Sequence, residues 1–202
     1  MKTITAGMLA LAALAGVACN DYSTAPASPS YSASGLPEAS VAAAGRAGGA
    51  RSGFGFNGTV SGFPTGAVFL TGGGSLDAAT ASNIVPSATD AKSGGGFRCT
   101  AAVAQGPLAG CATGEGVRWD TAQLLASTTF KCTGADAGKR IATGAGTVVL
   151  LADFYRAGDG IDESFTAQMI VSDTDIAPDI PGNQTLWVQG VGCGEALAHF
   201  SR

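Results

Sequence analysis

From residue 53 onward, apolar and polar residues alternate in short runs, which are separated by clusters of glycine and small polar residues. Alternation with a period of two is typical of strands with one buried face, and glycine-rich breaks are typical of turns. The pattern predicts about seven to nine short strands. These are residues 54–61, 66–71, 96–104, 116–125, 127–133, 146–155, 164–172, 184–191 and 194–200.

The alternation also predicts which side chains share a face. Three sets follow: Phe97, Cys99, Ala101 and Val103; Phe130 and Cys132; and Phe165, Ala167, Met169 and Val171. Segment 120–127 has a possible helix cap in Asp120, but its β-branched and aromatic neighbours favour a bent strand. We interpret the runs Gly72–Gly74 and Gly94–Gly96 as hairpin turns. The prediction is an all-β domain, an antiparallel β-sandwich or barrel.

The N-terminal residues have a different pattern. Met1 and Lys2 are followed by an apolar run over residues 4–18. This run is too short to span a bilayer comfortably. A short positive start before such a run is typical of a signal peptide. We therefore expect the chain to be exported, with residues 1–18 removed.

The end of this run, Ala15-Gly16-Val17-Ala18-Cys19, resembles the lipobox of bacterial lipoproteins. In that family, small residues precede a cysteine that is lipidated and becomes the first residue of the mature chain. The resemblance implies lipidation of Cys19 and anchoring in the bacterial cell envelope, although Gly16 stands where the family usually has leucine. Ordinary signal-peptide cleavage after Ala18 is the alternative, and it gives a soluble secreted protein.

The cysteine count fits lipidation. The chain has five cysteines, and assigning Cys19 to lipid leaves Cys99, Cys111, Cys132 and Cys193, enough for two structural disulfides in an oxidising compartment. Three pairings are possible. We favour Cys99–Cys111, because Gln105-Gly106-Pro107 lies midway between them as a potential chain reversal. This choice pairs Cys132 with Cys193.

Composition sets the domain organisation. Residues 20–52 are mostly alanine, serine, glycine and proline, so 19–52 is predicted to be a lipidated cysteine with a flexible tether. Residues 53–202 are enough for a single β domain with its own core. The layout from Gly94 to Phe200 is also similar to that of small exported bacterial β domains without a settled activity, a resemblance that concerns the fold class alone.

Charge and residue types exclude several functions. The formal net charge of −4, with 11 lysines and arginines, lacks the basic surface that nucleic-acid binding needs. The single histidine, His199, lies three residues from the end, and no GxSxG motif is present, so a histidine-based hydrolase is not expected. Trp119 and Trp187 fit strand positions in the core, and Trp187 is also a candidate contact residue of a binding module.

Acidic residues are concentrated between positions 153 and 179. Oxygen-rich loops of this kind can hold a calcium ion, and solvated turns with aspartate caps are the simpler alternative. The candidate calcium ligands are Asp159, Asp162, Glu163, Asp173 and Asp175.

These patterns together predict a lipid-anchored, disulfide-stabilised envelope protein. We expect a non-catalytic binding or structural module with no required cofactor, which contacts the membrane through its anchor and an envelope protein or glycan through its domain. The alternative is an extracellular hydrolase that uses carboxylates around Asp159 and Glu163 on a polysaccharide.

Overall fold

The computed structural model describes residues 51–84, 91–156 and 164–201. The predicted signal peptide, Cys19 and nearly all of the predicted tether lie outside these residues. Apart from one 3₁₀ turn, η1 (Ala78–Thr80), the described segments consist of strands and loops. Within them, no helix has the length and apolarity needed to cross a membrane.

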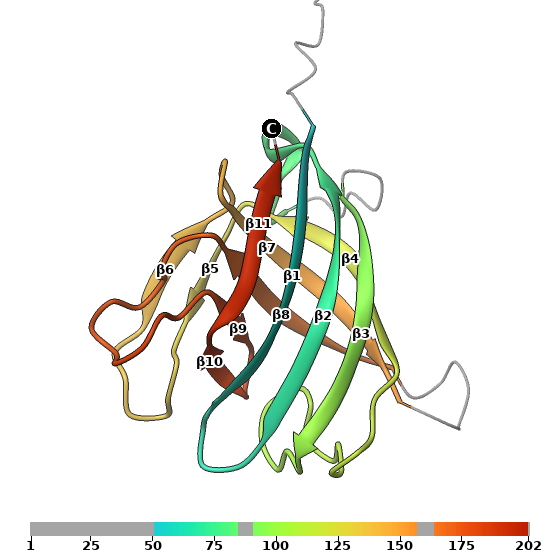
Figure 1. The fold of residues 1–202 in the computed structure, drawn as a ribbon, viewed down its shortest axis with the longest axis vertical. Coiled ribbons are helices and arrows are strands. Elements are labelled where there is room, and N and C mark those ends of the chain that lie inside the picture. Colours follow the sequence, from blue (N-terminus) through green and yellow to red (C-terminus); the bar gives the residue numbers. More distant parts are fainter. Residues whose placement is uncertain (1–50, 85–90, 157–163, 202) are drawn as a thin grey trace, which may run out of the picture. The chain divides into compact units, whose positions relative to one another are not determined.

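The strands follow one another along the chain in up-and-down order (Figure 1). Their bounds are β1 (Ser52–Gly62), β2 (Ala67–Leu76), β3 (Ala91–Ala101), β4 (Arg118–Leu125), β5 (Ser127–Phe130), β6 (Lys139–Ala142), β7 (Thr147–Tyr155), β8 (Ser164–Ser172), β9 (Leu186–Val188), β10 (Gly192–Gly194) and β11 (Ala196–Ser201).

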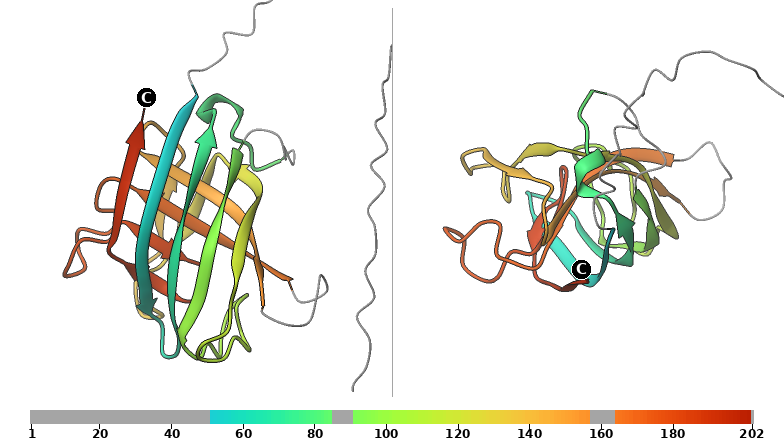
Figure 2. Two further views of the ribbon diagram at one scale, coloured as in Figure 1. Left: turned by 45° about the vertical axis from the view of Figure 1, so that its right-hand side comes forward. Right: turned by 90° about the horizontal axis from the view of Figure 1, so that it is seen from above.

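Eight of these strands close into an antiparallel barrel in the order β1-β2-β3-β4-β7-β8-β9-β10. Closure is made by two residue pairs between β10 and β1, Ser61 with Cys193 and Gly62 with Gly192. Strand β11 then pairs with the first half of β1. It uses the same edge of β1 with which β10 pairs farther along the strand. Figure 2 shows how the sheet curls round on itself. The all-β prediction is therefore confirmed, and the architecture is a barrel.

The barrel interior holds one apolar cluster. Inward-facing side chains alternate along the strands, as in Val68 and Leu70 of β2 or Leu186 and Val188 of β9, and all four are completely buried. The largest buried side chain of the cluster is Trp119, whose indole N–H donates to the Thr71 carbonyl at 3.1 Å. Eight-stranded barrels are just wide enough for side chains to fill them, and this one follows that rule.

Strands β5 and β6 form a separate hairpin outside the barrel, inserted between β4 and β7 (Figure 1). The hairpin and the loop before β9 cover the outer face of β7, β8 and β9, where Phe130, Val149, Ile170 and Trp187 form a second apolar cluster. This cover explains why β8 is buried on both faces over Met169–Ser172.

The glycine runs are not turns, contrary to the prediction. Gly72–Gly74 lies within β2 and Gly94–Gly96 lies within β3, and the two runs pair with each other, Gly72 opposite Gly95. A Cβ atom at Gly95 would lie 2.5 Å from the Gly72 Cα atom, and one at Gly72 would lie 2.6 Å from the Trp119 ring. Glycine is needed here because the two strands and a large buried ring approach closely.

Other differences concern faces and boundaries. Ala101 is exposed rather than buried, because a bulge pairs Ala67 with Ala101 and Val68 with Cys99, so that Thr100 is an extra residue on β3. Segment 120–127 is a strand as favoured, with an irregularity between Thr121 and Gln123. Strand β6 was not predicted.

Both favoured disulfides are present. Cys99 is bonded to Cys111, and Cys132 is bonded to Cys193. The first closes a loop of 12 residues at one end of the barrel, and the second joins the inserted hairpin to closing strand β10 over a separation of 61 residues.

Candidate functional site

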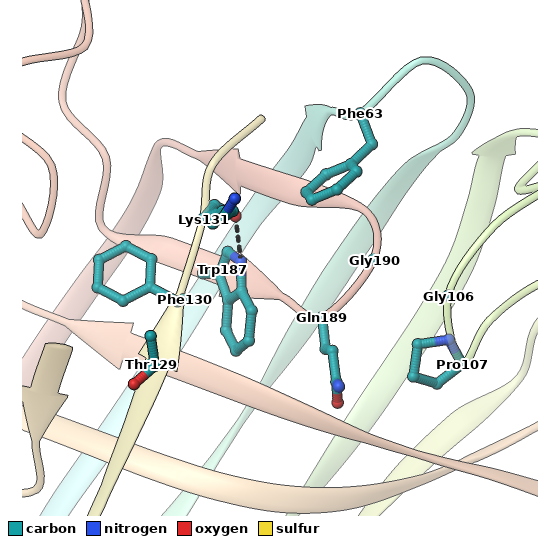
Figure 3. Close-up of a pocket in the computed structure, with 9 residues that line it drawn as sticks. All are labelled: Phe63, Gly106, Pro107, Thr129, Phe130, Lys131, Trp187, Gln189 and Gly190. Carbon is teal, nitrogen blue, oxygen red and sulfur yellow. Dashed lines mark hydrogen bonds between the residues drawn. The ribbon is translucent and has the colours of Figure 1, made fainter. Parts of the chain in front are cut away.

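A groove of about 380 Å³ lies where the inserted hairpin meets one end of the barrel (Figure 3). We call it the Trp187 groove. Its lining comes from the hairpin (Thr129, Phe130, Lys131), from β9 and the turn after it (Trp187, Gln189, Gly190), and from two loops (Phe63, and Gly106 with Pro107).

Trp187 forms the inner wall of this groove. It points outward from β9, because its neighbours Leu186 and Val188 face the barrel interior. Its ring lies 5.8 Å from the Phe130 ring, and its indole N–H donates to the Lys131 carbonyl at 2.8 Å. Only 3% of Trp187 is exposed. The predicted contact residue therefore borders a groove, although nearly all of its surface is buried.

The Cys132–Cys193 disulfide places the chain after β5 against the closing strand β10. Cys193 is paired with Trp187 across β10 and β9. The Cys132 carbonyl oxygen lies so close to Gly62 and Gly192 that a Cβ atom at either position would clash with it. Both glycines also have positive φ, 130° and 127°, which other residues rarely adopt. Two glycines and one disulfide thus fix the hairpin on the barrel.

Gln105 fixes the opposite rim. Its side-chain amide donates to the Thr65 carbonyl at 2.6 Å and to the Gly190 carbonyl at 2.8 Å, and its oxygen is hydrogen-bonded to the Thr65 hydroxyl. The backbone N–H of Phe63 donates to Val191 at 3.1 Å. These bonds join three loops that are far apart in the sequence. The rim is therefore held in place before any ligand arrives.

The polar groups around the groove favour a ligand that accepts hydrogen bonds. Lys131 is exposed and is the ionisable residue of the lining. The Gln189 side-chain oxygen already accepts from the Gln168 backbone N–H at 3.1 Å, which leaves its amide N–H groups to donate. Apolar walls with donors at the edge suit an apolar group that carries an acceptor or a negative charge.

The five predicted calcium ligands fall into two groups. Asp159, Asp162 and Glu163 lie outside the described residues, whereas Asp173 and Asp175 lie in the loop after β8, where Asp173 is exposed. Asp175 caps the loop before β9, since its side-chain oxygen accepts from the backbone N–H groups of Ala177 at 2.9 Å and Gln184 at 3.2 Å. Among the residues that the structure describes, no group of three histidine, cysteine or acidic side chains is placed to hold a metal ion. Calcium binding and the carboxylate hydrolase both stay predictions.

Trp119 and His199 were also named in the sequence analysis, and Asp179 is the last residue of the acidic region. Trp119 is in the barrel core. His199 is exposed on β11, and its ring lies over Gly55 of the paired strand β1, where a Cβ atom would be 2.6 Å from it. Asp179 is paired with Lys139 of β6 at 3.0 Å, and the hydrogen bond from Lys139 lowers the pKa of Asp179.

Several groove residues were missed by sequence reasoning. Gln105-Gly106-Pro107 was recognised as a chain reversal, but nothing in its spacing indicates that it meets Gly190. Phe63 and Lys131 carry no local signal of a site, because the groove depends on contacts between distant loops. Comparison of the chain with protein-family models, curated proteins and solved structures gave no match.

Proposed function

We propose that this protein is a lipoprotein of the bacterial cell envelope, anchored through Cys19, that acts as a non-catalytic binding module. The signal-peptide pattern, the lipobox-like end and the even number of the remaining cysteines support export and lipidation. Both disulfides use those four remaining cysteines, which leaves Cys19 as the unpaired one. An unpaired cysteine in an oxidising compartment is well explained by a lipid.

The observation that carries the binding role is the Trp187 groove. Because side chains fill the barrel interior, ligand contacts belong on its outside or at its ends. The groove is apolar, has a rim that is fixed by Gln105, and offers donors from Lys131 and Gln189. We propose that it receives an apolar group of an envelope partner together with an adjacent negative charge.

The position of the groove is compatible with tethering. The chain enters the barrel at Ser52, and Phe63 comes directly after the other end of β1. At about 3.3 Å per residue, the 11 residues of β1 separate these two points by roughly 35 Å. The tether is therefore joined to the barrel at the end of β1 that is away from the groove.

The anchor is tested by the intact mass of the non-reduced protein extracted from its native membrane. We expect a chain that starts at Cys19, carries a diacylglyceryl group and lacks four hydrogens because of two disulfides. A Cys19→Ser variant is the control and should be released from the membrane fraction. An unlipidated wild-type chain would overturn the anchor.

Binding in the groove is tested with anilinonaphthalene sulfonate, a fluorescent probe with an apolar ring system and one negative charge. The full-length protein should bind it in the Trp187 groove, where Phe63→Ser and Lys131→Gln should each weaken binding by about tenfold, which corresponds to roughly 1.4 kcal/mol. Ile84→Ser removes an apolar side chain that is 90% exposed elsewhere and is the matched control. Equal affinities in all four proteins would refute the assignment.

A further inference from the structure

A second hollow lies on the outer wall of the barrel, where β2 meets β3. Outward-facing residues pair across these strands, Phe69 with Arg98 and Thr71 with Gly96. The loop before β4, which includes Val117, forms the other side of an open trough of about 600 Å³. We call it the Gly96 trough.

Gly96 differs from the glycines around it. At Gly94 and Gly95, a Cβ atom would come within 2.9 Å of backbone atoms, so packing of the barrel requires glycine there. At Gly96 the nearest atoms to a Cβ would be the Thr71 methyl at 3.3 Å and the Val117 carbonyl at 3.6 Å, and its φ is not positive. Barrel packing therefore does not require glycine at this position. Glycine inside a strand weakens it, and it often marks a site where a ligand approaches the backbone.

The trough has exposed apolar walls. Phe69 is 41% exposed and Val117 is 52% exposed, so both keep apolar surface in water. With no side chain at Gly96 between them, a flat group can lie on the sheet against the Phe69 ring. Aromatic rings in such positions bury a large area at little entropic cost when a ligand stacks on them.

The charge at the trough is positive. Arg98 is exposed beside Phe69 and has no ion pair among the residues that the structure describes. Arg118, which is opposite Gly96 on β4, shows the contrast: it is 3.4 Å from Asp120 and lies over the Tyr155 ring. The Arg98 guanidinium is therefore available for a carboxylate of a ligand.

The location on the sheet face restricts the ligand further. The backbone groups of β2 and β3 pair with each other along this region, and β3 pairs with β4 at Gly96. An extended peptide that binds by strand addition needs an unpaired edge, which this face does not provide. Recognition must instead use a flat apolar surface and one positive charge.

We propose that the Gly96 trough binds an acidic polysaccharide through a sugar ring that carries a carboxylate. The apolar C–H face of the ring stacks on Phe69, the carboxylate pairs with Arg98, and the missing side chain at Gly96 makes room for the ring. The trough is open on the barrel surface, so neighbouring sugars of the chain continue into solvent. This site is separate from the Trp187 groove and does not rest on the function proposed for it.

The test is calorimetric titration of the full-length protein with tri-galacturonate and with its methyl ester, which keeps the rings and removes the charges. Wild-type protein should bind tri-galacturonate about tenfold more tightly than the ester. Gly96→Val should weaken binding of both by at least tenfold, and Arg98→Gln should abolish the preference between them. Phe69→Ala should weaken both.

Matched controls are Gly134→Val and Arg140→Gln. No atom lies within 4 Å of a Cβ atom placed at Gly134, and Arg140 is an exposed arginine of the hairpin. Both should bind like wild type, and all variants should keep the wild-type melting temperature within a few degrees. The proposal is overturned if wild type does not bind tri-galacturonate, if the ester binds equally well, if Gly96→Val leaves binding unchanged, or if tri-glutamate binds as tightly as tri-galacturonate.

Discussion

Replacing Cys132 and Cys193 together by alanine should destabilise the protein more than replacing Cys99 and Cys111 together. The Cys132–Cys193 bond joins the inserted hairpin to β10, and β10 closes the barrel through only two residue pairs with β1. The Cys99–Cys111 bond joins the end of β3 to the loop that follows it. All four cysteines are buried, so the two double variants remove comparable apolar surface.

The magnitudes follow from the loop that each disulfide closes in the unfolded chain. Sequence separations of 61 and 12 residues correspond to about 4.3 and about 2.8 kcal/mol in the chain-entropy model. The expected difference is therefore about 1.5 kcal/mol. Loss of the Trp187 packing next to Cys193 adds to the cost of the first variant.

Urea unfolding monitored by tryptophan fluorescence measures this difference. With a slope of about 2 kcal/mol per molar for a domain of this size, the midpoint should fall by about 2 M without the Cys132–Cys193 bond. Without the Cys99–Cys111 bond it should fall by about 1.4 M. An equal or larger loss for the Cys99–Cys111 variant would refute the assignment of the longer loop as the dominant constraint.

The other predictions concern single side chains. Gly95→Ala should lower the free energy of unfolding by about 2–3 kcal/mol because of overpacking, whereas Gly96→Ala should change it by less than about 0.5 kcal/mol; thermal unfolding of the two variants compares them directly. Gln105→Ala removes three hydrogen bonds at the rim of the Trp187 groove and should cost about 2 kcal/mol in urea unfolding. The pKa of Asp179 is lowered by Lys139, so this pair stabilises the fold above the ordinary carboxyl pKa, and the contribution disappears as pH falls through the lower folded value. Lys139→Gln should therefore be slightly less stable than wild type at pH 7 and equal to it near pH 2, as measured by urea midpoints at the two pH values.

Local alternation was enough to predict most of the barrel strands. Strand β8 is the clearest case, because Ala167, Met169 and Val171 all face the interior as the pattern predicts. The disulfide pairs were also predicted, since one turn signal between Cys99 and Cys111 favoured that pair and left Cys132 for Cys193. Both inferences needed only short-range information.

The failures came from long-range contacts. The glycine runs of β2 and β3 look like turns in the sequence, but they are strand segments that lie against each other and against Trp119. Trp187 is on the outer face of the barrel and is nevertheless buried, because the hairpin β5–β6 covers it. Neither the cover nor the groove beside it has a sequence signal, since each is made where distant segments meet.

The two proposed sites differ in what supports them, and this difference can be measured. The Trp187 groove depends on the hairpin, which the Cys132–Cys193 bond holds against β10. The Gly96 trough lies on β2 and β3 and on the loop before β4, with the Cys99–Cys111 bond nearby. Removing Cys132 and Cys193 should therefore weaken binding of anilinonaphthalene sulfonate while tri-galacturonate binding persists under native conditions. Loss of both together would mean that the disulfide maintains barrel closure itself, because closure is the feature that the two sites share.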